Sequence, residues 1–213
     1  MRSTKLKGGS LTLIGIIDYG VGNLRSIENA FRKIGTDCII SKTEKDLAKS
    51  DVLVLPGVGA FQDAMNNLRP LCSSLYTQVE SGKPLLGICL GMQILFSEST
   101  ENGLHEGLGI FRGRVVKLPS SVKIPHIGWN TLILNDEINP IFEGVPNNSY
   151  VYFVHSYYPI PENPTVTIAW TEYGVKFSSA INHKNIYATQ FHPEKSGKIG
   201  IKILENFVKI CRG

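Results

Sequence analysis

The first half of the chain alternates between two patterns of apolar residues. Short apolar runs predict buried strands, at residues 11–17, 52–56 and 84–88. Helical spacing of apolar residues predicts helices between and after them, at residues 24–35, about 60–82 and 90–99. Strands that alternate with helices are typical of a parallel sheet covered on both faces. This half is therefore predicted to be a doubly wound α/β unit.

The second half has a different texture, with short strand candidates separated by Pro, Asn and Gly turns. They lie at residues 114–118, 131–134, 150–155, 165–170, 175–181 and 185–191. Such close spacing predicts a strand-rich, partly antiparallel half. Residues 196–211 predict a terminal helix with Ser196 as its N-cap, packed back on the sheet.

Composition limits the class of protein. With 213 residues, 42% of them hydrophobic, the chain can bury a full core, and we expect a polar extension at residues 1–10 followed by one domain at 11–213. The net charge of +4 shows no basic cluster, and no apolar run is long enough to span a membrane, so neither a nucleic-acid nor a membrane role is expected. Four cysteines without a CxxC pair favour a reducing, cytoplasmic setting over zinc or disulfides.

Cys89 is the first candidate nucleophile. It lies between Gly87 and Gly91 where a predicted strand gives way to a helix, and such a turn lifts a side chain into a cleft. Backbone N–H groups at the start of the following helix can stabilise a thiolate and hold an oxyanion. Taken alone, a lone cysteine in an apolar strand is more commonly a buried residue that acts as a small hydrophobe.

A thiol nucleophile needs a base, and the base needs a group that orients it. His192 and Glu194 stand two positions apart after a predicted strand, so both can point the same way. Glu194 could accept the Nδ1–H of His192 and leave Nε2 to face Cys89. An ordinary turn with an exposed acid is the alternative for His-Pro-Glu alone.

A second oxyanion donor, besides the backbone N–H of Leu90, could come from the glycine-rich segment that follows the strand at 52–56. Gly57 and Gly59 flank Val58 there and let its amides turn toward or away from a ligand. An ordinary β-to-α turn is the alternative. The other glycine-rich loop, GVGNLR, has Arg25 where the third glycine of a dinucleotide-binding motif belongs, so that motif is a poor match.

Residues 12–211 resemble the class I, triad-type glutamine amidotransferases. The motifs that carry the resemblance occur in the same order: DYGVGNLRS, PGVGAFQDAM, LGICLGMQ, PHIGWN, YFVHSYY and QFHPEKS. The resemblance implies a three-layer, flavodoxin-like fold with a mostly parallel central sheet. It also implies that Cys89 attacks the side-chain amide of glutamine and forms a glutamyl thioester, while His192 transfers protons and Glu194 orients it. No cofactor or metal is implied.

Other residues receive roles from the same resemblance. Gln93 matches a position that holds the substrate, and His155, Ser156 and Tyr157 match a loop near its α-amino and α-carboxylate groups. From the residues alone, the 150–158 segment could equally be a strand whose aromatic side chains only pack.

Within the class, PHIGWN and YFVHSYY are similar to glutaminase subunits that supply ammonia to a (β/α)8 cyclase. That cyclase makes imidazole glycerol phosphate and aminoimidazole carboxamide ribotide in histidine biosynthesis. The resemblance places Asn23, Trp129 and Lys195 at or near the subunit face, although Trp129 could equally be a core residue. A paralogue that feeds another synthase, a noncatalytic binding domain and a free-standing γ-glutamyl hydrolase remain alternatives.

Overall fold

The computed structural model of the protein describes residues 12–135 and 137–212. The polar extension predicted at residues 1–10 lies outside the described residues, so this boundary and the single domain after it stay predictions. Among the described residues, eight strands form a central sheet. Their order is β2 (Asp37–Ser41), β1 (Leu13–Ile17), β3 (Val52–Leu55), β4 (Leu85–Ile88), β14 (Ile186–Thr189), β13 (Lys176–His183), β12 (Thr167–Glu172) and β9 (Ile133–Leu134).

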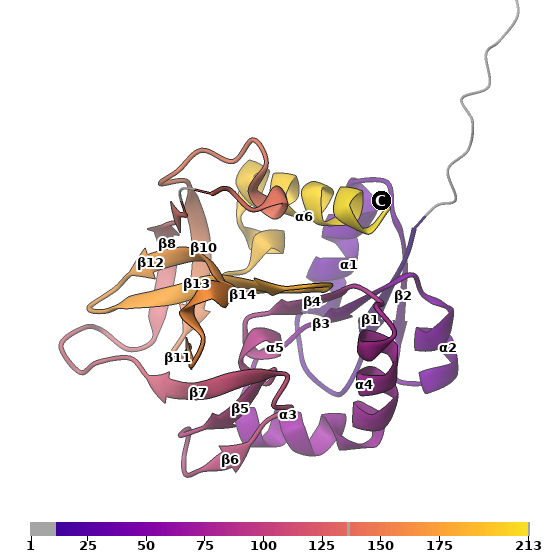
Figure 1. The fold of residues 1–213 in the computed structure, drawn as a ribbon, viewed down its shortest axis with the longest axis horizontal. Coiled ribbons are helices and arrows are strands. Elements are labelled where there is room, and N and C mark those ends of the chain that lie inside the picture. Colours follow the sequence, from indigo (N-terminus) through magenta and orange to yellow (C-terminus); the bar gives the residue numbers. More distant parts are fainter. Residues whose placement is uncertain (1–11, 136, 213) are drawn as a thin grey trace, which may run out of the picture.

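Helices cover both faces of this sheet (Figure 1). On one face α1 (Leu24–Lys33) and α6 (Gly197–Cys211) pack in a core that includes Val54; on the other, α3 (Phe61–Leu68) and α4 (Cys72–Glu80) pack in a core that includes Leu53. Neighbouring residues of a strand point to opposite faces, which is why an uninterrupted apolar run such as 52–55 serves both cores. The three-layer α/β fold expected from the resemblance is confirmed.

The strands from β2 through β14 run parallel, and β13, β12 and β9 continue the sheet antiparallel. Two smaller sheets lie beside it. One pairs β8 (His126–Thr131) with β10 (Tyr150–His155), and the other has the order β11 (Tyr157–Pro161), β7 (Phe111–Lys117), β5 (Phe96–Ser99) and β6 (His105–Glu106). The partly antiparallel second half is as predicted. No helix of the described residues is long and apolar enough to cross a membrane.

The helix predicted over residues 90–99 is wrong in its second half. Helix α5 (Leu90–Gln93) makes one turn, and the chain then enters β5, where Phe96 pairs with Phe111 of β7. Pairing with strands that follow later in the chain overrides the local helical spacing. The sequence analysis also missed β2 and the short helix α2 (Glu44–Lys49) after it.

Ser196 precedes α6, but its side chain does not cap the helix. Its hydroxyl donates to the His192 carbonyl at 2.6 Å and accepts from the Tyr152 backbone N–H at 2.9 Å. Ser196 therefore occupies the N-cap position, as predicted, but its hydroxyl joins β10 to the segment after β14 instead of bonding to an N–H of the helix.

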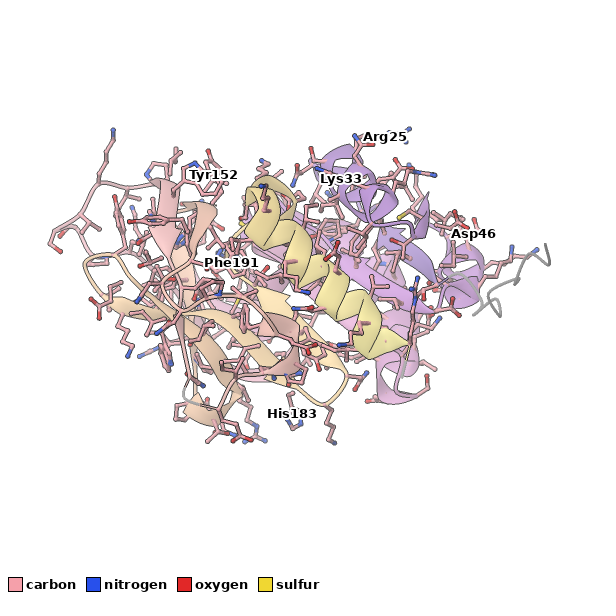
Figure 2. All side chains as sticks on the ribbon, turned by 90° about the horizontal axis from the view of Figure 1, so that it is seen from above. Arg25, Lys33, Asp46, Tyr152, His183 and Phe191 are labelled. Atoms are coloured by element: carbon pink, nitrogen blue, oxygen red, sulfur yellow. The ribbon has the colours of Figure 1, made fainter. Side chains whose placement is uncertain are left out.

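The order of strands in the central sheet determines where the candidate catalytic residues meet. Strand β4 lies directly beside β14, with Ile88 opposite Thr189. The carboxyl ends of parallel neighbours leave the sheet at the same edge, so residues after 88 and after 189 meet there. Figure 2 shows Phe191, which is fully buried, close to α6, whereas His183 at the far end of β13 lies at the margin of the molecule.

Candidate active site

Cys89 occupies a sharp turn between β4 and α5. Its backbone has φ 55° and ψ −109°, a conformation that side chains disfavour. The turn also brings backbone segments into close approach, since a Cβ on Gly91 would lie 1.8 Å from the Leu55 carbonyl oxygen. A Cβ on Gly87 would lie 2.9 Å from the Gly91 carbonyl oxygen, so the close approach requires both glycines of the motif.

His192 and Glu194 reach the same edge of the sheet. The Cys89 N–H donates to the Thr189 carbonyl at 2.7 Å, and the His192 N–H donates to the Tyr152 carbonyl at 2.9 Å. His192 Nδ1 lies 2.7 Å from Glu194 Oε1, and both side chains are fully buried. Hydrogen bonding through Nδ1 leaves Nε2 for the reaction, as predicted.

Asn23 completes this arrangement. Its amide donates to Glu194 Oε1 at 2.6 Å, so the carboxylate has two partners on one oxygen. The family resemblance implies a place for Asn23 only at or near a subunit face. In the structure the residue is half-buried and holds the carboxylate that orients His192.

The imidazole of His192 is electrostatically coupled to Cys89. Burial lowers the pKa of His192, but Cys89 and then Glu194 outweigh burial and raise this pKa to about 10. Nε2 has no hydrogen-bond partner among the described residues. A protonated imidazole beside a thiol is suited to stabilise a thiolate and then to give its proton to a leaving group.

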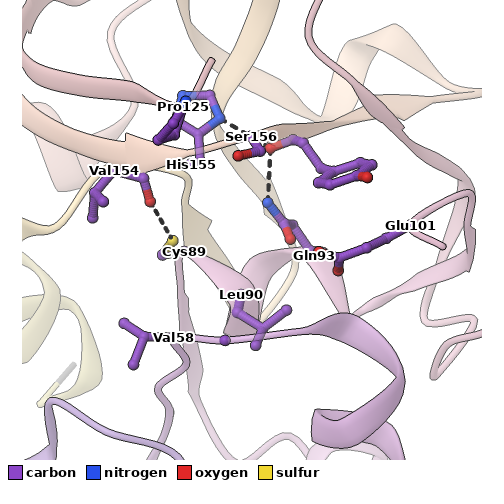
Figure 3. Close-up of a pocket in the computed structure, with 11 residues that line it drawn as sticks. Val58, Cys89, Leu90, Gln93, Glu101, Pro125, Val154, His155 and Ser156 are labelled. Atoms are coloured by element: carbon purple, nitrogen blue, oxygen red, sulfur yellow. Dashed lines mark hydrogen bonds between the residues drawn. The ribbon is translucent and has the colours of Figure 1, made fainter.

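The sulfur of Cys89 has two polar neighbours, although the residue is only 5% exposed and belongs to the same apolar core as Val54. The thiol donates to the Val154 carbonyl oxygen at 3.7 Å and accepts from the Gln190 amide at 3.7 Å. The first of these contacts is the dashed line from Cys89 to Val154 in Figure 3. Gln93, one turn after Cys89, donates its amide protons to the Tyr157 carbonyl at 2.8 Å and to Gln190 Oε1 at 3.1 Å. Because both protons are used, the group that Gln93 offers a ligand is its carbonyl oxygen, an acceptor.

A pocket of about 220 Å³ opens beside the sulfur. Figure 3 shows Val58 and Leu90 on one side of it and Val154, His155 and Ser156 on the other. Of the residues predicted for the oxyanion hole and for substrate binding, the structure brings these to the pocket: Leu90, Val58, Gly59, Gln93, His155, Ser156 and Tyr157. Its small volume and its polar lining groups, among them Gln93 and Ser156, suit a small polar substrate.

Gly57, the remaining predicted oxyanion residue, does not line the pocket but packs against the turn. A Cβ there would lie 2.7 Å from Leu90 Cβ, and Gly59 has φ +118°. Leu90 is the first residue of α5, so its N–H has no acceptor within that helix. Both segments predicted to donate to an oxyanion are therefore adjacent to the thiol.

Glu101 also lines the pocket, and the sequence analysis missed it. Its carboxylate accepts from the Phe61 N–H at the start of α3 at 2.7 Å. No motif marks this residue, because it follows β5, whose position depends on pairing with later strands. The signal available in the sequence was only an acid in a Gly-containing turn.

Trp129 and Lys195 lie on the surface, with 55% of the tryptophan exposed, so the core alternative for Trp129 is wrong. The indole packs edge-on against Tyr152, with ring centroids 6.0 Å apart. No group of three or more metal-ligating side chains occurs among the residues that the structure describes.

Comparisons with known proteins agree with this geometry. Residues 15–211 match the family described as glutamine amidotransferase class-I. The imidazole glycerol phosphate synthase subunit HisH of Methanothermobacter thermautotrophicus is 53% identical over 94% of this chain and all of that protein, and its counterpart in Methanocaldococcus jannaschii is 52% identical over 93% and 100%. A solved structure from Thermoplasma acidophilum, described as a putative GMP synthase subunit, superposes with a TM-score of 0.73 at 25% identity, covering 96% of each chain. The chain belongs to the class-I glutamine amidotransferase family, and within it to the HisH subunits of imidazole glycerol phosphate synthase.

Proposed function

We propose that this chain hydrolyses glutamine to glutamate and ammonia, with Cys89 as nucleophile, His192 as proton carrier and Glu194 as orienting carboxylate. The observation that carries the proposal is the buried 2.7 Å contact between His192 and Glu194 at the edge of the sheet where Cys89 faces its pocket. Burial of His192 and Glu194 beside a cysteine with a strained backbone is typical of a catalytic site and is not expected in a noncatalytic domain.

The reaction follows from these groups in two steps. The Cys89 thiolate attacks the amide carbon of glutamine, a C–S bond forms, and the oxygen becomes an oxyanion near Leu90 and the 57–59 segment. The C–N bond then breaks as His192 gives its proton to the nitrogen, which leaves as ammonia. Water attacks the glutamyl thioester, its proton passes to His192, and glutamate leaves from the restored thiolate.

The pocket supports glutamine as the substrate. Gln93 presents an acceptor oxygen, and Glu101 presents a carboxylate that matches an α-ammonium group. Ser156 and the peptide groups around Tyr157 also line the pocket, where they suit an α-carboxylate.

The ammonia is proposed to pass to a (β/α)8 cyclase subunit that makes imidazole glycerol phosphate and aminoimidazole carboxamide ribotide. The two relatives named above are subunits of imidazole glycerol phosphate synthase. On this chain, exposed Ile127, Trp129 and Tyr150 share one face of the β8–β10 sheet and could pack against a partner.

The test is glutamine hydrolysis by the full chain, alone and with the cyclase subunit of imidazole glycerol phosphate synthase plus its ribulosyl substrate. Cys89→Ala is expected to abolish hydrolysis, whereas Cys72→Ala on α4 should not. Activity that survives in Cys89→Ala would overturn the mechanism. Hydrolysis that is the same with and without the cyclase and its substrate would overturn the proposed partner.

A further inference from the structure

A pair of buried histidines lies behind the pocket. His126, in the PHIGWN motif, is 4% exposed and does not line the pocket, whereas His155, 5% exposed, does. His126 Nδ1 and His155 Nε2 are 2.9 Å apart. The His126 ring is stacked on Tyr173, with centroids 3.9 Å apart, and on Phe153 at 4.9 Å. The mechanism above does not use this pair.

The contact between His155 and Tyr157 fixes the direction of the hydrogen bonds through the two histidines. His155 Nδ1 lies 2.9 Å from the Tyr157 carbonyl oxygen, and a carbonyl can only accept. His155 must therefore carry its proton on Nδ1 in this contact. Its Nε2 then accepts from His126 in the neutral state, so His126 also carries its proton on Nδ1.

The contact between Asn130 and His126 requires the same direction of hydrogen bonding. The Asn130 amide is oriented by two backbone groups, because its oxygen accepts from the Thr131 N–H at 2.8 Å and its nitrogen donates to the Glu172 carbonyl at 3.0 Å. The same nitrogen lies 3.4 Å from His126 Nε2, which must act as an acceptor. Burial lowers the pKa of His126 to about 4 and that of His155 to about 3, consistent with two neutral rings.

The Tyr157 carbonyl links this pair to the thiol. It accepts from His155 on one side and from the Gln93 amide on the other, at 2.8 Å. Gln93 in turn donates to Gln190, whose amide donates to the Cys89 sulfur. Reversing the tautomer of His155 would set its Nδ1 lone pair against the Tyr157 carbonyl and displace the peptide that holds Gln93.

We propose that His126 is a positioning residue for glutamine binding: its Nδ1–H fixes the tautomer of His155, which holds the Tyr157 carbonyl and through it the Gln93 side chain. His126 does not contact the substrate and acts only through His155 and the pocket residues that His155 holds. The role rests on the proposed glutaminase function, which supplies the ligand.

Two substitutions with the same number and branching of side-chain heavy atoms separate the hydrogen bond from the stacked ring. His126→Leu and His126→Asn both remove the stacked ring, but only Asn keeps an N–H near the position of Nδ1. Glutamine affinity is measured by calorimetry with the full chain in a Cys89→Ala background, which prevents turnover. We expect His126→Leu to weaken binding about tenfold and His126→Asn to stay within about threefold of the parent. His183→Leu, at the exposed end of β13, is the control and should leave affinity unchanged.

Nitrogen NMR of the wild-type protein tests the tautomers directly and needs no substitution. The chain has five histidines, so ¹⁵N-histidine labelling gives an assignable spectrum. At pH 7 we expect both His126 and His155 to carry one proton, on Nδ1. A proton on His155 Nε2 would overturn the proposal even if both variants failed to fold.

The outcomes also separate this role from the proposed function. If the parent binds glutamine and His126→Leu binds it equally well, the positioning role alone is wrong. If wild-type protein neither binds nor hydrolyses glutamine with its cyclase present, the proposed function is wrong and the role falls with it.

Discussion

The backbone strain at Cys89 predicts that Cys89→Gly is more stable to unfolding than Cys89→Ala, the reverse of the usual order of glycine and alanine. At φ 55° and ψ −109° the residue lies outside the left-handed helical region as well as the common ones, and such strain costs about 1–3 kcal/mol. Glycine would relieve it, while its extra freedom in the unfolded chain costs about 0.5–1 kcal/mol. Taking the upper part of the strain range, Cys89→Gly should exceed Cys89→Ala in unfolding free energy by about 2 kcal/mol.

The assay is thermal unfolding of both variants, neither of which carries the nucleophile. A difference of this size corresponds to about 4–8 °C in Tm for a chain of this length. Cys72 supplies the matched control, because it opens α4 with φ −57° and ψ −47°. There the ranking should reverse, with glycine less stable than alanine by about 1 kcal/mol. If Cys89→Gly were no more stable than Cys89→Ala while the Cys72 pair behaved as expected, the strain argument would be refuted.

Three further predictions concern ionisable groups. Glu194→Gln removes the charge that stabilises protonated His192 and should lower kcat about 10²- to 10⁴-fold in a glutaminase assay; a loss under about threefold would contradict its role. Glu101→Gln keeps an acceptor for α3 but removes the pocket carboxylate, so KM for glutamine should rise about tenfold with kcat nearly unchanged, and an unchanged KM would contradict it. The lowered pKa values of His126 and His155 mean that only the unfolded chain gains these protons as the pH falls below about 6.5. The stability that the two neutral rings contribute is complete above that pH. It is lost by up to about 1.4 kcal/mol per pH unit for each ring down to about pH 4. Urea unfolding at about pH 7 and 5.5 should therefore show a smaller loss of unfolding free energy in His126→Asn than in wild type, and equal losses would contradict the burial argument.

Several features were predictable because they depend on short stretches of chain. The run at 52–55 is apolar at every position, which is enough to indicate a buried strand. The glycines around Cys89 and the spacing of His192 and Glu194 likewise reflect local backbone geometry. The residue types and their positions after predicted strands already indicate Cys89, His192 and Glu194 as one candidate site, and the placement of β4 beside β14 brings these segments to the same edge of the sheet.

Other features depend on contacts between distant segments, and only the tertiary structure decided them. The helix predicted through residue 99 stops at Gln93 because β5 finds partners in β6 and β7, and that pairing also carries Glu101 to the pocket. The sequence by itself therefore determined the α/β alternation, the strained turn at Cys89 and the identity of its candidate partners. The bond from Asn23 to Glu194 and the proton direction through His126 were decided by the fold, because a hydrogen bond needs a donor and an acceptor within about 3 Å and only sheet order and register bring such residues together.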